Sequence, residues 1–575
     1  MSRRTEQTRW TRTFVNALVQ TGIQNAVISP GYRNTSLVSA ILERDEIRTF
    51  SVFDERAAAY VALGQARITQ RPSLLICTSG TAGAHYLPAI IEAQQSGLPL
   101  LVVTTDRPLS LDQCGAPQTI QQINLYGQHV EGFFELGDAR SDEESLRAVS
   151  RKAAQAYERT LFPKSGPVHV NFRSEKPLEL DNDDIPRASV FSVKSIRGES
   201  QLSKQDFDEF FNACLNAKQG LVIAGALPLI SNKLKKQILS FCQRRGFALH
   251  AEATSQLRFS DVDEMPSPIV DYMDLYLRDD SHRKSCRPDL IIQLGRAPVS
   301  KGVQTLLQES NETPLIVISP EQWNDANNQA TMVVRSRLED VFQQAEDYDQ
   351  TSQIKRHTNK WLEHHATLSS EYSKRVQACL HSETLTEGQI TRAVTSSAPS
   401  SSVLFAANGL PVRHLDTFIP AHSVDLDILS QRGTSGIDGQ VAGVLGAATL
   451  VNKPTTALIG DIGFLHDISS LANSKIVQVP VVFVIINNAG GRIFEQLPIA
   501  KSGLGEDQWR YWTTPQNFDL TKICRGYGVS VKACHSLSEI VNSLETAYDK
   551  PGVTVVDAHV GSESFVHESE ILWGQ

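Results

Sequence analysis

Short apolar runs alternate with amphipathic helical stretches along almost the whole chain, and this alternation constrains the fold more than any other feature. Apolar runs at residues 25–29, 49–53, 73–77 and 100–104 are separated by helical patterns such as 56–68 and 82–95. Strands that are buried on both faces by crossover helices have this appearance in a sequence. The pattern therefore predicts an α/β fold with mostly parallel sheets.

The alternation resumes twice further along the chain. Apolar runs recur at 220–224, 289–295 and 314–319, and again at 403–406, 455–459, 481–486 and 553–557, with a polar linker-like stretch at 179–186 and a charged helical stretch at 340–385. The chain has 575 residues, and single domains commonly hold about 100–200. We expect three consecutive α/β domains, at residues 1–185, 195–355 and 380–575.

Charge and composition narrow the classes of partner. The formal net charge is −9, whereas nucleic-acid binding needs a contiguous positive surface, so nucleic acid is not an expected partner. The first residues lack the apolar core of a signal peptide, and no apolar run approaches the ~20 residues that span a bilayer. We expect a cytoplasmic protein that does not enter a membrane. The eight cysteines form no C-x-x-C pair, which favours reduced structural thiols.

The clearest chemical signal lies in the last third of the chain. Gly460 and Asp461 end one apolar run, and Asn488 follows the next run within the sequence INNAGG. Mg²⁺ usually takes one or two protein oxygens while phosphate oxygens complete its shell, and glycines let the backbone approach an anion closely. Each dipeptide alone is a common turn signal. Their spacing across one strand–helix–strand unit predicts a metal–diphosphate site made of Asp461, Asn488 and the main chain at Gly490.

This arrangement resembles the diphosphate motif of thiamine-diphosphate-dependent enzymes, although relatives usually have a further glycine where this chain has Ile462. Such enzymes also need a carboxylate that hydrogen-bonds the aminopyrimidine of the cofactor and so promotes loss of the thiazolium C2 proton. Glu55, at an expected strand end, fits this role. Its local sequence alone favours a simpler role, in which an acidic residue stabilises the first turn of an alanine-rich helix. Because the metal motif is present in the same chain, the cofactor role is the preferred prediction for Glu55.

Seven segments carry a closer resemblance. They are residues 29–34 (SPGYRN), 53–56 (FDER), 77–82 (CTSGTA), 105–108 (TDRP), 114–118 (CGAPQ), 432–439 (RGTSGIDG) and 487–494 (NNAGGRIF). With them the chain resembles, over nearly its whole length, the MenD family of 2-succinyl-5-enolpyruvyl-6-hydroxy-3-cyclohexene-1-carboxylate synthases. The segments at 432–439 and 105–108 are more typical of this family than of thiamine enzymes in general.

The resemblance implies a pyrimidine-binding domain, a central domain without cofactor and a diphosphate-binding domain. It also implies a homodimer or homotetramer with active sites between subunits, so that Glu55 of one subunit serves a cofactor whose Mg²⁺ or Mn²⁺ is held by another. Residues at the cofactor-contacting positions of the family are Thr81, Arg432, Ser435, Gly436, Ile437, Gly460, Ile493 and Phe494. Ile437 matches the apolar residue that props the cofactor into its bent conformation.

The implied activity is decarboxylation of 2-oxoglutarate and 1,4-addition of the resulting succinyl-semialdehyde anion to isochorismate, a step of menaquinone biosynthesis. Both substrates are dicarboxylates, and arginine is suited to bidentate carboxylate contacts. The substrate-contacting positions of the family hold Arg33, Arg107, Gln118, Lys301, Arg413, Arg432, Ile493 and Phe494. Arg33 and Gln118 are expected to act in catalysis together with Glu55.

Four positions in the substrate region depart from the usual residues of the family. Tyr32 stands in place of serine, Pro117 of asparagine, Gly302 of arginine and Gly409 of serine. A buried polar contact commonly contributes about 1 kcal/mol, so the loss of several would alter substrate affinity. The acceptor is therefore open, and a related synthase that adds the same succinyl donor to another acceptor is the alternative.

Two further alternatives are weaker. A pyruvate-type synthase or decarboxylase needs fewer positive partners than this chain offers. A catalytically inactive scaffold is expected to have lost Glu55, Asp461 or Asn488, and all three are present.

Overall fold

The computed structural model describes residues 2–181, 193, 195–198, 201–259, 267–351 and 360–573. The chain forms two compact units. Unit 1 comprises Met1–Arg197, Gln431–Asn452 and Leu465–Val479, and unit 2 comprises Gly198–Ser430, Lys453–Phe464 and Pro480–Gln575.

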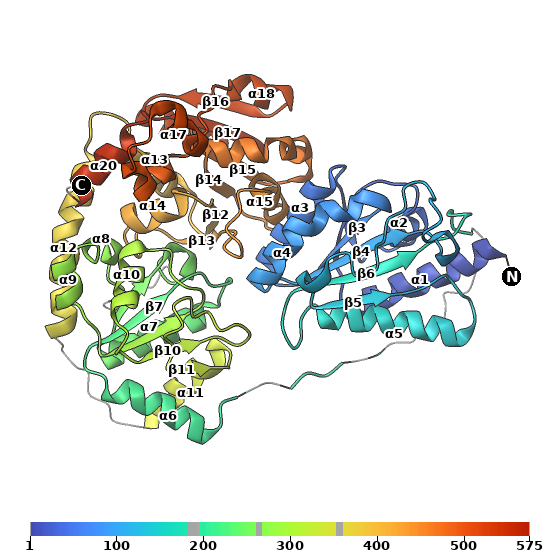
Figure 1. The fold of residues 1–575 in the computed structure, drawn as a ribbon, viewed down its shortest axis with the longest axis horizontal. Helices are drawn as coiled ribbons and strands as arrows, with labels where there is room; N and C mark the ends of the chain where they lie inside the picture. Colours follow the sequence, from blue (N-terminus) through green and yellow to red (C-terminus); the bar gives the residue numbers. More distant parts are fainter. Residues whose placement is uncertain are drawn as a thin grey trace. The chain divides into compact units, whose positions relative to one another are not determined.

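Unit 1 contains a six-stranded parallel sheet with strand order β2-β1-β3-β4-β6-β5 (Figure 1). Its strands are β1 (Asn25–Ile28), β2 (Arg48–Ser51), β3 (Ser73–Cys77), β4 (Leu100–Asp106), β5 (Gly132–Glu135) and β6 (Pro167–Arg173). The α-helices around it are α1 (Arg3–Thr21), α2 (Thr35–Leu42), α3 (Glu55–Thr69), α4 (Leu87–Ser96) and α5 (Glu143–Arg159), and the 3₁₀ helices are η1 (Gly80–Tyr86), η2 (Leu109–Leu111) and η3 (Gly127–His129).

Successive side chains of these strands pack in opposite directions, as a pleated strand requires. Ile28 and Ile76 pack with α1, α2 and α5, whereas Val27 and Leu75 pack with α3 and α4. The sheet is therefore covered by helices on both faces, as the alternating sequence pattern predicts.

Unit 1 also contains α15 (Gln440–Ala448) and the 3₁₀ helix η5 (Ile468–Ile476), and α15 packs against α3. Glycines permit a very close approach of these two helices. A Cβ on Gly64 would lie 2.0 Å from the carbonyl oxygen of Gly443, and one on Gly446 would lie 2.1 Å from that of Val61. Because the neighbours are backbone atoms, any larger residue would force the helices apart.

The first sheet of unit 2 has five parallel strands in the order β11-β10-β9-β7-β8. They are β7 (Gly220–Ala224), β8 (Ala248–Ala251), β9 (Leu290–Leu294), β10 (Leu315–Ile318) and β11 (Met332–Val334). The accompanying helices are α6 (Lys204–Asn216), α7 (Asn232–Arg245), η4 (Ala253–Ser255), α8 (Met273–Tyr276), α9 (Asp280–Ser285), α10 (Lys301–Glu309), α11 (Leu338–Thr351) and α12 (Lys360–Leu380). Helices α6, α7 and α11 pack on one face, and α8, α10 and α12 pack on the other.

The second sheet of unit 2 has six parallel strands in the order β13-β12-β14-β15-β17-β16. They are β12 (Ser402–Ala406), β13 (Leu426–Leu429), β14 (Thr455–Gly460), β15 (Pro480–Asn487), β16 (Ser530–Cys534) and β17 (Gly552–His559). Its helices are α13 (Glu387–Ser397), α14 (Pro411–Phe418), α16 (Asp461–His466), η6 (Arg492–Gln496), η7 (Pro498–Lys501), α17 (Glu506–Thr513), α18 (Leu520–Gly526), α19 (Leu537–Ala547) and α20 (Ser564–Trp573).

The first and last sheets of the chain share one topology. Numbered within its own sheet, each has the strand order 2-1-3-4-6-5. Helices α3 and α15 both follow the second strand of their sheet and precede the third. The two helices that pack together in unit 1 are therefore topologically equivalent.

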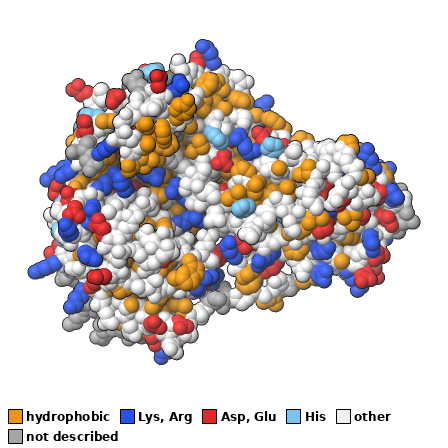
Figure 2. All heavy atoms as spheres, viewed as in Figure 1, with side chains coloured by type: hydrophobic (Ala, Val, Ile, Leu, Met, Phe, Trp, Pro, Cys, Tyr) orange, Lys and Arg blue, Asp and Glu red, His pale blue; other side chains and the backbone are white. Residues whose placement is uncertain are grey.

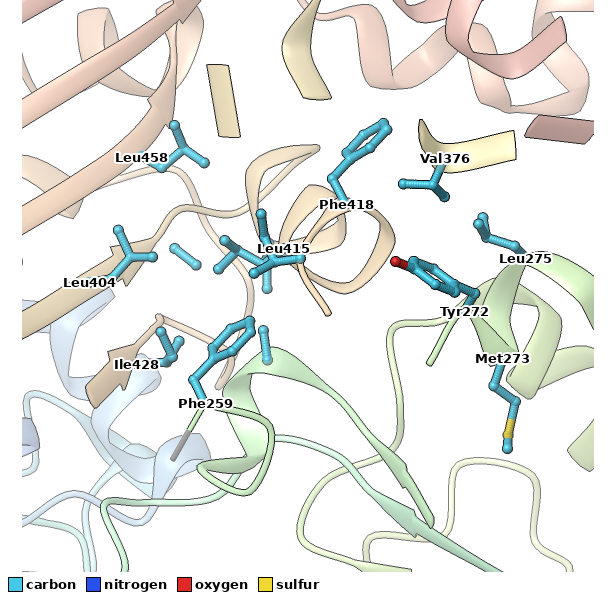
Figure 3. Close-up of a cluster of buried hydrophobic side chains, with 14 of the residues drawn as sticks. Phe259, Tyr272, Met273, Leu275, Val376, Leu404, Leu415, Phe418, Ile428 and Leu458 are labelled. Carbon is cyan, nitrogen blue, oxygen red and sulfur yellow. The ribbon is translucent and has the colours of Figure 1, made fainter. Parts of the chain in front are cut away.

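A single apolar cluster connects the two sheets of unit 2. Leu415 on α14 lies between Leu404 on β12 and Tyr272 beside α8 (Figure 3). This packing holds α14 firmly between elements of both sheets.

The structure confirms the predicted α/β class, with three parallel sheets and interleaved helices. The expected continuous helix at 82–95 is wrong, because a 3₁₀ helix runs to Tyr86 and α4 begins at Leu87. Pro88 stands in the first turn of α4, where its missing N–H costs nothing, although it would break a helix interior. The expected linker at 179–186 lies mostly outside the described residues, as do residues 352–359 of the stretch at 340–385. The proposed domain boundaries stay predictions.

Three further observations bear on the sequence expectations. Within the described ranges, no helix combines the length and the apolar character that crossing a bilayer requires. All eight cysteines are free thiols, as expected. Acidic and basic side chains are interspersed over the face that Figure 2 shows.

Candidate active site

The strand register of the last sheet brings the predicted metal ligands to one edge. Gly460, the last residue of β14, pairs with Ile486 of β15, so Asp461 and Asn488 both follow strands that end at the same sheet edge. Asp461 is 4% exposed, and its carboxylate accepts hydrogen bonds from the N–H groups of Ile462 and Gly490, each at 2.8 Å. Burial raises the pKa of Asp461 to about 6. The charge of Arg492 only partly opposes this effect of burial, so the carboxylate still favours a cation.

Asn488 supplies the second predicted ligand. Its side chain is 6% exposed, and its Nδ2 donates to Glu387 Oε1 at 2.8 Å. Its Oδ1 is buried and has no hydrogen-bond partner among the described residues. A buried amide oxygen without a partner is costly in a dry interior, and it is one of the oxygen types that Mg²⁺ or Mn²⁺ accepts.

The backbone between these two residues is shaped for close approach. Gly490 has φ +134°, and a Cβ there would lie 2.5 Å from the carbonyl oxygen of Thr513. The Gly490 carbonyl accepts the Arg492 N–H at 2.9 Å, which leaves its second lone pair for another partner. A Cβ on Gly460 would meet no atom of the described residues within 4 Å, so space is open beside Asp461.

The donor set fits a divalent cation that also binds an anionic ligand. No group of three or more His, Cys, Asp or Glu side chains that could hold a metal occurs in the described parts of the chain. One carboxylate, one amide oxygen and one main-chain carbonyl leave further positions of an octahedral shell to phosphate oxygens and water. Thiamine diphosphate, whose diphosphate would fill those positions, suits this set.

Glu55 is the first residue of α3 in unit 1, and the helix is capped by its neighbour. The Asp54 carboxylate accepts the N–H groups of Arg56 at 2.9 Å and Ala57 at 3.3 Å. Among the described residues, the Glu55 carboxylate makes no hydrogen bond or ion pair. Asp54 is therefore the N-cap residue, and Glu55 is the acidic residue of the first turn, as the local sequence predicts.

The segment at 432–437 lies in unit 1 and is held by a buried glutamate on α4. Glu92 accepts hydrogen bonds from the N–H groups of Gly433 at 2.9 Å and Thr434 at 2.6 Å, and from Thr434 Oγ1 at 3.0 Å. Arg67 lies 3.1 Å from the same carboxylate. Burial alone would raise the pKa of Glu92, but the charge of Arg67 and the two N–H groups lower it. Ser435, next in the chain, has φ +61°.

A second anchor follows directly. A Cβ on Gly436 would lie 2.3 Å from Asp438 Oδ1, and Asp438 accepts a hydrogen bond from the Tyr60 hydroxyl on α3. Ile437 and Arg432 are both half-buried. The loop thus enters α15 in a conformation that Glu92 and Tyr60 fix from two sides.

Arg33 and Arg107 form a cationic pair in unit 1. Burial and the charge of Arg107 lower the pKa of Arg33, while the charge of Asp106 raises it. Arg33 donates to the carbonyl of Ser174 at 2.9 Å, and Arg107 donates to that of Gln118 at 2.6 Å and to the Ser79 hydroxyl. Both guanidinium groups donate to neutral oxygens, and such groups are suited to an anion such as a carboxylate.

Gln118 and Thr81 border this pair. Gln118 has φ +56° and its Nε2 donates to the Ser79 carbonyl at 3.1 Å, and Thr81 is an exposed residue of η1. The side chains of both are open to solvent in the single chain.

The two remaining cationic candidates lie in unit 2. Lys301 is exposed at the first turn of α10. Arg413 on α14 is half-buried, donates to the Gly409 carbonyl and has its pKa lowered by burial, against the opposing influence of Glu252, Asp274 and Asp416.

The remaining site candidates divide between the units as follows. Thr81, Arg432, Ser435, Gly436 and Ile437 belong to unit 1 with Glu55, whereas Gly460, Ile493 and Phe494 belong to unit 2 with Asp461, Asn488 and Gly490. Ile493 and Phe494 lie half-buried on η6.

Two of the four departures in the substrate region have backbone causes. A Cβ on Gly302 would lie 2.3 Å from the carbonyl oxygen of Asp274, so no arginine fits there. Gly409 has φ +100°, which strains a serine. Tyr32 is 55% exposed and donates its hydroxyl hydrogen to Glu179 at 3.0 Å. Pro117 is exposed, and nothing in the structure explains the loss of asparagine there.

The sequence reading missed two residues that organise the site. Glu92 stands inside the apolar helical run LPAIIEA, and a charged residue on a buried helix face is a detectable signal. Glu387 begins α13 within the capping box of Thr386 and Gln389. The capping box gives no indication that the Glu387 side chain reaches Asn488.

Comparison with known proteins identifies the class of enzyme. Residues 8–125 match the family model of the thiamine pyrophosphate enzyme, N-terminal TPP binding domain, and residues 417–558 match that of the C-terminal TPP binding domain. Glu55 lies in the first match, and Asp461 and Asn488 lie in the second. The chain is a thiamine-diphosphate-dependent enzyme, of a class that joins carbon atoms.

The similarity to curated relatives extends over nearly the whole chain. A protein of Sorangium cellulosum is 36% identical over 98% of the chain and 94% of its own length. Proteins of Geobacillus kaustophilus (31%; 98% and 96%) and Haloarcula marismortui (33%; 89% and 88%) are similar to nearly the same extent. All three bear the name 2-succinyl-5-enolpyruvyl-6-hydroxy-3-cyclohexene-1-carboxylate synthase. The chain belongs to the family of these synthases, as the resemblance predicts.

Proposed function

We propose that this protein uses thiamine diphosphate to decarboxylate 2-oxoglutarate and to transfer the succinyl-semialdehyde unit to isochorismate by 1,4-addition. The product is 2-succinyl-5-enolpyruvyl-6-hydroxy-3-cyclohexene-1-carboxylate, a compound of menaquinone biosynthesis. The observation that carries the proposal is the near-full-length similarity to synthases of that name, up to 36% identity. When bound, the cofactor supplies the carbon nucleophile and the electron sink that this chemistry needs.

Asp461, Asn488 and the Gly490 carbonyl hold Mg²⁺ or Mn²⁺ in this proposal. The partnerless Oδ1 of Asn488 and the buried carboxylate of Asp461 support the assignment. The open space beside Gly460 admits the diphosphate. Thr81, Ser435, Gly436, Arg432, Ile493 and Phe494 line the cofactor, and Ile437 supports its bent form.

Glu55 acts as the acid–base residue for the aminopyrimidine ring. Its carboxylate is not needed for capping α3, since Asp54 performs that function. Held at the start of a helix, where the dipole favours a negative charge, the carboxylate accepts the ring N–H and promotes the tautomer that removes a proton.

The cationic side chains position the two dicarboxylate substrates. Arg33 and Arg107, whose guanidinium groups donate to neutral oxygens in unit 1, bind a substrate carboxylate. Gln118 stands beside this pair, and Arg33 and Gln118 contact the reacting groups. Lys301, Arg413 and Arg432 bind the remaining carboxylates, and Ile493 and Phe494 exclude water from the reacting atoms.

Isochorismate is the favoured acceptor over another acceptor in specialised metabolism. Two departures from the family, Gly302 and Gly409, are explained by local backbone geometry and need no change of substrate. The near-full-length similarity argues in the same direction.

The working enzyme is a homodimer or homotetramer in this proposal, and its active sites lie between subunits. A cytoplasmic location, expected from the sequence, is part of the same proposal. Glu55 of one subunit then serves the cofactor that Asp461 and Asn488 of another subunit hold.

The decisive experiment combines 2-oxoglutarate, isochorismate, thiamine diphosphate and Mg²⁺ with the purified protein and determines the product mass. The expected product retains both carboxylates of isochorismate and gains the succinyl group, with release of one carbon dioxide. Pyruvate in place of 2-oxoglutarate is the matched control. A preference for pyruvate, or carbon dioxide release without a product that contains the isochorismate ring, contradicts the proposal.

A further inference from the structure

Two buried carboxyl groups lie in unit 2 where η4 is in contact with α14. Glu252, just before η4, is 1% exposed, and its Oε1 accepts hydrogen bonds from the N–H groups of Val299 at 2.6 Å and Ser300 at 2.9 Å and from Ser300 Oγ at 3.0 Å. Asp416 on α14 is 8% exposed, and its Oδ1 accepts the N–H of Ala253 at 2.6 Å. Each carboxyl group is therefore held by the backbone through one oxygen.

The other oxygen of each group has no such support. Glu252 Oε2 and Asp416 Oδ2 are both buried and have no hydrogen-bond partner among the described residues. An ionised carboxylate can only accept hydrogen bonds, and burial of an ionised oxygen that has no partner is strongly unfavourable. Burial, and next the charge of Asp416, raise the pKa of Glu252 to about 8. Burial raises that of Asp416 to about 6.

The charged groups around the pair are almost balanced among themselves. They are His250 on β8, Arg258 beyond η4, Asp271, Asp274 and Arg278 at α8, and Arg413 on α14. Arg258 pairs with Asp271 at 3.0 Å, and Arg278 pairs with Asp274 at 2.9 Å. Burial lowers the pKa of His250 to about 4, so this ring is neutral near neutral pH.

When these two ion pairs and the neutral His250 are set aside, the charge of Arg413 is left to balance the two carboxyl groups. Two negative charges against one positive charge would leave a net negative centre in a dry interior, whereas one bound proton makes the group of three neutral. A metal ion in place of the proton is disfavoured because Arg258 and Arg413 both act on Asp416 from close by.

We propose that Glu252 and Asp416 share one proton, as an O–H···O hydrogen bond between their free oxygens, and act as positioning residues for Lys301 and Arg413. The inference rests on the proposed function, in which Lys301 and Arg413 bind substrate carboxylates. It adds to that function a pair of residues that touch no substrate and a proton on which substrate binding depends.

Few residues connect the two carboxyl groups to Lys301 and Arg413. Glu252 fixes Val299 and Ser300, and Ser300 is the residue immediately before Lys301 at the start of α10. Asp416 ties η4 to α14, on which Arg413 lies three residues earlier. Leu415 and Phe418 of the same helix are packed in the apolar cluster, so α14 cannot turn independently (Figure 3). The shared proton thus connects the start of α10, which carries Lys301, with the last turn of α14, which carries Arg413 one turn earlier.

Loss of the shared proton has a predictable effect on substrate binding. Above the pKa both groups are ionised, they repel one another, and their net negative charge opposes a substrate carboxylate at Arg413. The KM of the dicarboxylate substrates is then expected to rise as pH passes through about 8, by up to about tenfold per pH unit because one proton is released. The kcat is expected to change much less, since neither residue touches the reacting atoms.

The test compares the wild type with Glu252→Gln, Asp416→Asn and the surface control Glu312→Gln across this pH range. An amide at either position mimics the protonated carboxyl group, because its NH₂ donates to the remaining carboxylate while its oxygen accepts the backbone N–H. Glu252→Gln and Asp416→Asn should therefore keep the low KM and make it independent of pH. Glu312→Gln should retain the alkaline rise of the wild type. Glu252→Ala should raise KM at every pH.

Two outcomes overturn the inference. One is an alkaline rise in KM that is as steep in Glu252→Gln as in the wild type. The other concerns the infrared spectrum. The wild type should show a protonated-carboxyl band that both amide variants lack, and the absence of such a band contradicts the inference. The infrared measurement needs no turnover. Failure of the wild type to join 2-oxoglutarate to isochorismate would contradict the proposed function, while the infrared result still decides whether the proton is shared.

Discussion

Asn488 donates its Nδ2 hydrogen to Glu387 over 2.8 Å, and this bond determines which atom of the Asn488 amide remains for a metal. Its Oδ1 is buried without a partner among the described residues. Glu387 is itself fully enclosed, and burial and the charge of Glu568 raise its pKa to about 8. Orientation of a ligand by a buried neighbour is common in metal sites.

Substitution of Glu387 should weaken cofactor binding without removing any ligand. Glu387→Ala frees the Asn488 side chain to rotate, and we expect the affinity for thiamine diphosphate with Mg²⁺ to fall about 10–100-fold, as for other residues that orient ligands. Glu387→Gln keeps an oxygen that accepts the Asn488 N–H and should bind nearly as the wild type does. Calorimetric titration measures both. Equal affinity in the alanine variant and the wild type would show that Asn488 needs no orientation.

Asp461→Ala should abolish stabilisation by the cofactor. A ligand at 100 times its dissociation constant stabilises the folded state by about 2.7 kcal/mol. Thiamine diphosphate with Mg²⁺ should therefore raise the Tm of the wild type and leave that of Asp461→Ala unchanged. A cofactor-dependent rise in the variant would remove Asp461 from the metal site.

The sequence predicts the sheet-edge part of this site well, and the reason is physical. Strand runs that end in Gly460-Asp461 and Asn487-Asn488 belong to neighbouring strands, and the carboxyl ends of parallel strands meet at one edge. The polar residues beneath them are harder to predict. The partnership of Glu387 with Asn488 and that of Glu252 with Asp416 join positions more than 100 residues apart in sequence, and no local pattern encodes such distances.

The backbone conformation at single residues is likewise difficult to predict from the sequence. In the sequence, Gly302 and Gly409 suggest that substrate contacts have been lost. In the structure, the close approach of α8 and α10 accounts for Gly302, and a positive φ accounts for Gly409. The break between η1 and α4 was missed for a similar reason, since the apolar pattern continues through it while the hydrogen bonding changes.

Gly302→Ala should destabilise the fold. Its Cβ would lie 2.3 Å from the Asp274 carbonyl oxygen, and a backbone atom cannot move aside without shifting α8 from α10. We expect a loss of about 1–3 kcal/mol in the free energy of unfolding, as for other overpacked sites. Gly561→Ala is the matched control, because its Cβ would meet no atom of the described residues within 4 Å. Urea denaturation of both variants measures the difference, and equal stability would show that the helices yield easily.

Mixing two inactive variants tests the proposed inter-subunit site. Glu55→Gln and Asp461→Ala should each be inactive alone. If Glu55 of one subunit serves the metal site of another, a mixed dimer contains one intact site, and full exchange should restore about a quarter of the wild-type activity. Native mass spectrometry confirms that subunits have exchanged. Exchange without recovered activity would place both residues in one subunit's own site.

Glu92→Gln should loosen the segment at 432–437 and reduce stability in a pH-dependent way. The carboxylate holds Gly433 and Thr434 and neutralises Arg67, and removal of one partner of a buried pair costs about 3 kcal/mol. Despite its burial, the pKa of Glu92 is lowered by Arg67 and the two N–H groups. A carboxyl group with a lowered folded pKa stabilises the fold above its unfolded pKa, and this stability is lost as pH falls through the folded value.

The difference in free energy of unfolding between the wild type and Glu92→Gln should therefore be full near neutral pH. It should shrink as pH falls below the ordinary glutamate value of about 4.3. Denaturant titrations at a series of pH values measure it, with Glu143→Gln, an exposed residue at the start of α5, as the control. A difference that stays constant with pH would mean that Glu92 acts through its shape and hydrogen bonds, and that its charge on Arg67 contributes nothing. The affinity for cofactor should fall in Glu92→Gln at every pH, because the segment that carries Arg432, Ser435 and Ile437 loses its anchor.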